Sequence, residues 1–496
     1  LSLHDALPIF LRPDARVFAL WDIHEMGYLI YGLTMDHRFF GEQASLEAAR
    51  KLANYLIDRW SAEPDREPGG GMITVHMAVT GVESAMLALH DATQDRRYLD
   101  FCVQMRKLPE WNARIVTGRH GQIEGHAYAH ICRCIAQLRL NRLQPDQRLL
   151  KPAHDVIDFL TGHDGLVITG ACGDHECWHD TQEGTLNLGE TCATAYLIRM
   201  LDELLRMEGR PLYGDLMERA IYNALFAAQS PDGRRIRYYS PFDGPREYFK
   251  GDTYCCPCNY RRIVAELPGM ICYRAGDGVL VNLYTPSTVK LALAGENTVT
   301  IRQETKYPQD GTVVLNVDPA QPAEFKLQLR VPRWCDTPAA AVNGERLSAE
   351  AKPGEFLTIN RRWQAGDSVR LELPMKWRLV KGRQAQAGRV AVMRGPLVFG
   401  LNRARHEKLA KVDLRLIVID PDTLQEPVAD DSVHPGGLAC RLQAWEPGAW
   451  YPMSKKTLDL TLTEFADPAG EAVYFKVPDP KAAGLVDDEL SSGVFR

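Results

Sequence analysis

Apolar residues in the first half of the chain recur with the period of an α-helix. The segments 46–60, 82–93, 126–140 and 191–207 place apolar side chains at positions i, i+3, i+4 and i+7. Stretches that contain Gly, Pro or His separate these segments. Repeated helical hairpins of this kind predict an α/α toroid. A helical solenoid is the alternative interpretation, and no tight sequence period decides between the two.

The pattern changes near Cys272 to the two-residue alternation that is typical of β-strands. Asp310-Gly311 and Asn343-Gly344 lie between apolar runs and are typical of hairpin turns. We expect strands at 278–285, 297–305, 311–317, 324–331, 368–374, 389–401, 458–465 and 472–478. The sequence therefore predicts a helical domain over 10–271, a β-sandwich over 272–380 and a second β-sandwich over 381–496.

The first nine residues, LSLHDALPI, differ in character from the rest of the chain. They look like translated sequencing-adapter DNA, so we interpret residues 1–9 as a non-native segment and exclude them from the fold. On this interpretation the natural chain starts further upstream, and the helical domain is truncated at its N-terminus.

Length and charge narrow the classes of protein. A chain of 496 residues is too long for one ordinary core and predicts two to four domains. Its 45% hydrophobic and 25% charged residues are typical of a soluble globular protein. With a net charge of −6 and no run of like charge, we expect no nucleic-acid partner. No apolar stretch approaches the ~18 residues of a membrane span, so no membrane partner is expected either. A homodimer stays open.

Twelve cysteines could indicate disulfides, but several of them are clustered, as in Cys132 with Cys134 and in Cys255, Cys256 and Cys258. Adjacent cysteines rarely pair, because the geometry of such a bridge is strained. In a large enzyme such clusters favour metal binding or catalysis and a reducing compartment, so we expect a cytoplasmic protein.

Two short segments concentrate metal-type ligands. Glu190 and Cys192 are two residues apart at the expected start of a helix, and Cys255 and Cys256 are expected in a loop. Zinc accepts thiolate and carboxylate ligands in tetrahedral geometry, so the two pairs could form one cage. The spacing alone does not distinguish this cage from buried cysteines that pack as small apolar residues.

Several other residues could have either a catalytic or a structural role. Glu176, in the ionisable segment 173–180, lies near Trp178, where a raised pKa would suit a general acid; a solvated polar loop is the alternative. His126 and His130 are one helical turn apart, a spacing that fits a metal pair or core histidines. Glu218 and Tyr238 fit either catalytic or packing roles.

Several motifs, in this order along the chain, resemble glycoside hydrolase family 127, the β-L-arabinofuranosidase family. The resemblance covers essentially the whole chain. The residues that carry it are Gly125-His126-Ala127, Glu190-Thr191-Cys192-Ala193, Glu218-Arg219 with Tyr222-Asn223, Cys255-Cys256-Pro257 with Asn259 and Arg261, and Arg394-Gly395-Pro396-Leu397. The resemblance implies an (α/α)6 toroid followed by two β-sandwich domains.

The resemblance also implies a reaction. It assigns a zinc ion to Glu190, Cys192, Cys255 and Cys256. Cys255 would also be the nucleophile that attacks the anomeric carbon, and Glu176 would be the acid/base. The expected activity releases a terminal sugar, β-L-arabinofuranose, with retained configuration. The residues expected to bind this sugar are His126, Glu218, Tyr238, His76 and Tyr28.

Three departures from the family pattern bear on these assignments. Cys258 stands where many members have proline and could compete as a ligand. Cys177 adds a thiol beside Glu176, and Tyr28 stands where other members have histidine.

Two alternative functions remain open. The chain could hydrolyse another plant-glycan side-chain sugar, acidic or branched, through arginines of 233–235 and 260–262. It could instead bind glycans without catalysis and hold zinc structurally.

Overall fold

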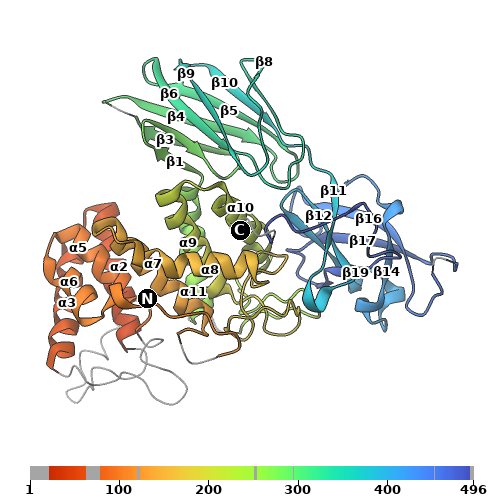
Figure 1. The fold of residues 1–496 in the computed structure, drawn as a ribbon, viewed down its shortest axis with the longest axis horizontal. Helices are drawn as coiled ribbons and strands as arrows, with labels where there is room; N and C mark the ends of the chain where they lie inside the picture. Colours follow the sequence, from red (N-terminus) through yellow and green to blue (C-terminus); the bar gives the residue numbers. More distant parts are fainter. Residues whose placement is uncertain are drawn as a thin grey trace. The chain divides into compact units, whose positions relative to one another are not determined.

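The computed structural model describes residues 22–62, 79–119, 123–250, 254–293, 295–451 and 453–491 (Figure 1). The chain forms two compact units. The first runs to Phe159 and includes Glu176–Trp178, and the second comprises Leu160–His175 and the chain from His179 onward. Among the described residues, no helix is both long and apolar enough to cross a bilayer.

The first unit is built from helices that share one apolar core. α5 (Val82–Thr93) confirms the predicted helix over 82–93. α2 (Asp22–Phe40) packs against α5 so closely that a Cβ at Gly27 would lie 3.1 Å from the Cα of Val82. The other helices are α3 (Gln43–Ala62), α6 (Arg96–Asp100), the π-helix η1 (Phe101–Met105), the 3-10 helices η2 (Leu108–Glu110) and η3 (Gln147–Leu149), α7 (Ala127–Leu143) and α8 (Lys151–Gly162), whose last three residues belong to the second unit.

Three further helices and two short helical segments precede the first strand of the second unit. α9 (Thr191–Glu208) confirms the helix predicted over 191–207 and ends at Gly209, which adopts the left-handed conformation common at helix C-termini. α10 (Pro211–Arg219) continues directly into the π-helix η4 (Ala220–Leu225). α11 (Cys255–Glu266) packs against α9 and leads into the 3-10 helix η5 (Leu267–Met270).

The strands predicted between residues 278 and 374 belong to two sheets. A four-stranded sheet has the order β1-β2-β6-β9, and a six-stranded sheet has the order β3-β4-β5-β10-β7-β8. Their strands are β1 (Cys272–Ala275), β2 (Gly278–Val281), β3 (Ser287–Ala292), β4 (Thr298–Thr305), β5 (Thr312–Pro319), β6 (Ala323–Arg330), β7 (Ala339–Val342), β8 (Glu345–Arg346), β9 (Phe356–Trp363) and β10 (Asp367–Glu372). Side chains of both sheets share one apolar core. Asn343 and Gly344 join β7 to β8 with φ of 51° and 85°, as a type I′ turn requires.

The last part of the chain forms one ten-stranded sheet. Its strands are β11 (Trp377–Lys381), β12 (Arg389–Arg394), β13 (Leu397–Asn402), β14 (Val418–Asp420), β15 (Val428–Ala429), β16 (Leu438–Trp445), β17 (Leu458–Glu464), β18 (Gly470–Ala472), β19 (Tyr474–Lys476) and β20 (Leu485–Val486). β12 pairs with β19 through its first half and with β13 through its second half. A sandwich would have two separate sheets. Here the change of partner along β12 connects all ten strands into one hydrogen-bonded sheet.

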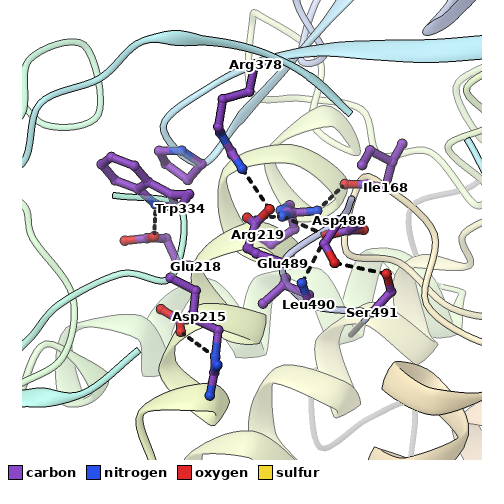
Figure 2. Close-up of polar contacts among 12 residues, drawn as sticks. Ile168, Asp215, Glu218, Arg219, Trp334, Arg378, Asp488, Glu489, Leu490 and Ser491 are labelled. Atoms are coloured by element: carbon purple, nitrogen blue, oxygen red, sulfur yellow. Dashed lines mark hydrogen bonds and ion pairs between the residues drawn. The ribbon is translucent and has the colours of Figure 1, made fainter. Parts of the chain in front are cut away.

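Two buried ion networks join α10 to the β regions. Arg330, at the end of β6, is fully buried and donates to Asp215 Oδ1 at 2.5 Å and to Glu218 Oε1 at 2.6 Å. The Tyr307 hydroxyl also donates to Glu218 Oε1, at 2.6 Å. Trp334 Nε1 donates to Glu218 Oε2 at 3.3 Å (Figure 2). Arg333 Nε lies 3.5 Å from Asp215 Oδ2, so Asp215 faces two guanidinium groups, and burial still raises the pKa of Asp215 to about 7.

The second network holds the C-terminal segment. The carboxylate of Glu489 accepts one hydrogen bond from Arg219 at 2.5 Å, through Oε1, and one from Arg378 at 2.7 Å, through Oε2 (Figure 2). Burial alone would raise the pKa of Glu489, but the two guanidinium groups outweigh it and lower this pKa to about 2. Glu489 is therefore ionised at neutral pH, where it ties the end of the chain to α10.

Replacement of Arg330 by methionine is expected to lower the free energy of unfolding by about 3–5 kcal/mol, because the buried Glu218 loses its guanidinium partner and Asp215 keeps only one of its two, through the 3.5 Å contact with Arg333. Urea denaturation followed by circular dichroism measures the change. Arg302→Met is the matched control, since the pair of Arg302 with Glu304 is more than half exposed and should contribute under about 1 kcal/mol. Equal losses in the two variants would contradict this view of the network.

Candidate metal centre and active site

Glu190 and Cys192 are positioned by the start of α9, as the sequence predicts. Glu190 is the extended residue before the helix, and it follows Gly189, whose φ of 68° suits glycine. The backbone here pairs with the segment around Tyr238: the amide of Thr191 donates to the carbonyl of Tyr238 at 2.9 Å. This pairing holds the Glu190 backbone extended, and Cys192 then falls in the first turn of α9.

Cys255 and Cys256 are the first two residues of α11 and do not lie in a loop, so that part of the prediction is wrong. The reason is Pro257, which resembles a helix breaker in the sequence. In the first turn of a helix, proline loses no hydrogen bond, because the amide groups there have no partner within the helix. The starts of two helices, α9 and α11, therefore carry the four metal-type side chains.

The four side chains come together as one group. One ligand atom from each of Glu190, Cys192, Cys255 and Cys256 lies within 4.8 Å of the others. The sulfurs of Cys192 and Cys256 are 3.2 Å apart, and Cys256 Sγ is 3.8 Å from Glu190 Oε1. Elsewhere in the described parts of the chain, no three such side chains gather as closely, and Cys258 is not a member of this group.

The electrostatics of the group favour a bound cation. Glu190, Cys192 and Cys256 are at most 1% exposed, whereas Cys255 is partly exposed. Burial raises the pKa of the Cys192 and Cys256 thiols well above the usual range. None of the twelve cysteines, all of which lie in the described residues, forms a disulfide. A metal ion would supply the charge that lets these buried sulfurs ionise, so the group could hold a metal.

The first unit contains the predicted acid/base, Glu176, beside the predicted sugar ligand His126. The Nδ1 atom of His126 accepts from the amide of Ala129 at 3.3 Å, which leaves the ring proton on Nε2. Nε2 lies 3.5 Å from Glu176 Oε2. Glu176 has a φ of 66° and follows His175 with a φ of 49°, so two successive residues other than glycine adopt the left-handed conformation at this turn.

Tyr28 belongs to the same polar group. Its hydroxyl is 2.6 Å from the hydroxyl of Tyr128, whose ring contacts that of His126 edge-on at 6.1 Å between centroids. Tyr128 was not among the predicted site residues, although it follows His126 by two residues. His130 is fully buried and in edge contact with both Trp111 and Trp178. Burial lowers the pKa of His130 to about 4, so it is a neutral core histidine.

The remaining predicted residues have different surroundings. Tyr238 places its hydroxyl 3.7 Å from Cys255 Sγ. It therefore lies next to the metal group, as we call Glu190, Cys192, Cys255 and Cys256 together. Glu218 is 1% exposed, and both of its carboxylate oxygens are engaged by Arg330, Tyr307 and Trp334. None of these partners is another predicted site residue, so a sugar-binding role for Glu218 stays a prediction. His76 lies outside the described residues.

Comparison with models of known protein families shows which family the chain belongs to. Residues 12–269 match the model of the β-L-arabinofuranosidase GH127 catalytic domain, and residues 278–375 match the GH127 middle domain. The chain belongs to glycoside hydrolase family 127. The resemblance of its motifs to this family is thereby confirmed.

Relatives of this GH127 chain include a non-reducing end β-L-arabinofuranosidase of Bifidobacterium longum subsp. longum. The two are 25% identical over 444 residues, which cover 76% of this chain and 64% of that protein, so the chain spans less than two thirds of its relative. The solved GH127 β-L-arabinofuranosidase of Geobacillus stearothermophilus T6 aligns with a TM-score of 0.76 at 24% identity, over 94% of this chain and 82% of that one. A second solved structure, a GH127 β-arabinofuranosidase, aligns with a TM-score of 0.77 at 23% identity, over 92% of this chain and 76% of that one. These structures share the fold of the GH127 chain.

Proposed function

We propose that this GH127 chain is a retaining glycosidase that releases terminal β-L-arabinofuranose through a zinc-bound Cys255. The observation that carries the proposal is the group of three sulfurs and one carboxylate, in which Cys255 alone among the sulfurs is partly exposed. The names of the GH127 relatives support the sugar. The proposal includes an (α/α)6 arrangement of the helical domain over residues 10–271, followed by two β domains.

The donor set fits zinc. Zinc accepts three thiolates and a carboxylate, and in a tetrahedral site with Zn–S of ~2.3 Å the sulfurs are about 3.8 Å apart. The Cys192–Cys256 distance of 3.2 Å and the 4.8 Å limit for the whole group bracket that value. Zinc bound there keeps the sulfurs ionised at neutral pH and stabilises sulfur as a leaving group.

In the first step, the Cys255 thiolate attacks the anomeric carbon, and the bond from this carbon to the aglycone oxygen breaks. Glu176 gives its proton to that oxygen. His126 Nε2, 3.5 Å from Glu176 Oε2, orients the carboxyl group. The product is a thioglycosyl group on Cys255, with inverted configuration at the anomeric carbon.

In the second step, the Glu176 carboxylate takes a proton from water, and the water oxygen attacks the anomeric carbon. The carbon–sulfur bond breaks, and its electron pair returns to Cys255. Two inversions give net retention. The proposal requires Glu176 and Cys255 to reach one sugar.

Removal of the metal tests the proposal. The purified protein is expected to carry one zinc per chain and to hydrolyse an aryl β-L-arabinofuranoside. Chelation should abolish the activity, and added Zn²⁺ should restore it, because the buried thiols are protonated without the ion. Metal analysis and a panel of aryl glycosides give the result. Full activity after removal of zinc would contradict the mechanism, and selective hydrolysis of another sugar would contradict the substrate.

A further inference from the structure

The three sulfurs of the metal group have different hydrogen-bonding neighbours. Asn259 lies one helical turn after Cys255 on α11 and is 1% exposed. Its side-chain amide donates from Nδ2 to Cys192 Sγ at 3.1 Å. The same amide accepts, through Oδ1, a hydrogen bond from Arg262 Nη1 at 2.9 Å. Arg262, Asn259 and Cys192 therefore form a relay that ends on one sulfur.

Arg262 determines which way the Asn259 amide is turned. A guanidinium group has donors and no acceptor, so it must face the carbonyl oxygen of the amide. The NH₂ group is then directed to Cys192, where it can only donate. The contact with Arg262 therefore fixes which end of the Asn259 amide is oxygen and which is nitrogen, an assignment that the shape of the side chain alone does not give.

The chemistry of the group explains why a donor is needed at this sulfur. Three thiolates and one carboxylate around a divalent ion leave an excess of negative charge in a buried site, where water cannot compensate it. A hydrogen bond to Cys192 spreads part of that charge and reduces the nucleophilicity of this sulfur. Cys255 is nearer to solvent and has the Tyr238 hydroxyl at 3.7 Å, a longer contact.

We propose that Asn259, oriented by Arg262, is a positioning residue that keeps Cys192 as a holding ligand of the metal and leaves Cys255 as the reactive sulfur. This inference rests on the proposed function. Asn259 touches neither the sugar nor the reacting carbon, and it acts through Cys192. Its effect should therefore appear in metal binding as well as in turnover.

The test uses Asn259→Leu, which has a similar volume and no donor, and Arg262→Met, which keeps the amide but removes the group that orients it. Competition with a chromophoric chelator measures the Zn²⁺ dissociation constant. Absorption of the Co²⁺-substituted protein reports the thiolate–metal bonds. Asn259→Leu should weaken zinc binding by about 10- to 100-fold and change the charge-transfer band, and Arg262→Met should do the same to a smaller extent. kcat should fall with KM unchanged.

Arg370→Met, which removes an exposed guanidinium from β10, is the matched control and should bind zinc as the wild type does. If Asn259→Leu does not fold, Arg262→Met at a partly exposed position carries the test. Wild-type zinc affinity and an unchanged Co²⁺ spectrum in the variants would overturn this inference alone. A wild-type protein that binds no zinc would overturn the inference and the proposed function together.

Discussion

Replacement of Cys255 by alanine is expected to lower kcat/KM for an aryl β-L-arabinofuranoside by at least about 10⁴-fold, because no thioglycosyl group can form. The partly exposed position of Cys255 makes it the sulfur that a sugar can reach. Glu190, Cys192 and Cys256 remain, so the variant should fold and still bind zinc, although more weakly. Initial rates, zinc content and circular dichroism measure these three properties.

Cys258→Ala is the matched control for this variant. Cys258 lies on the same helix, three residues later, and is not part of the metal group. We expect activity within about twofold of the wild type, because surface-near substitutions away from a site have small effects. An active Cys255→Ala protein, or an equal loss in both variants, would contradict the assignment of the nucleophile.

Glu176→Gln is expected to lower turnover by about 10²- to 10⁴-fold, the usual contribution of a positioned acid/base. The loss should depend on the leaving group. An activated aryloxide departs without a proton, so the first step should survive, while the second step loses its base and the thioglycosyl group accumulates. Azide needs no base and should restore turnover, giving a glycosyl azide. Burst kinetics with a series of aryl glycosides measure this pattern.

Glu183→Gln gives the comparison for Glu176→Gln, since Glu183 is an exposed carboxylate in the segment that follows. It should retain wild-type rates and show no response to azide. If Glu176→Gln slows all substrates equally and azide has no effect, Glu176 is not the acid/base.

The sequence predicted the elements that bury a regular apolar face. α5 and α9 match their predicted ranges closely, because the helical period of their apolar residues is the face that packs in the core. The start of α11 was not predicted. Its first turn contains two metal-type cysteines and a proline, so it carries no apolar period that would distinguish a helix from a loop.

Part of the site could not be predicted, because its contacts join distant parts of the chain. Glu218 meets Arg330 and Trp334, which are 112 and 116 residues away, so no local pattern indicates that its carboxylate is already engaged. Asn259 was visible only as part of a motif, since its contact with Cys192 spans 67 residues. The four metal-type ligands were predictable because each pair is local in sequence.

The most direct test of the zinc–thiolate account is to trap the covalent intermediate. Glu176→Gln protein is incubated with an activated aryl β-L-arabinofuranoside, quenched, digested and mapped by mass spectrometry. The account predicts one pentosyl group on the peptide that begins α11, attached to Cys255. A pentosyl group on Glu190 or another side chain, or its absence while the burst of aryloxide is observed, would contradict the account.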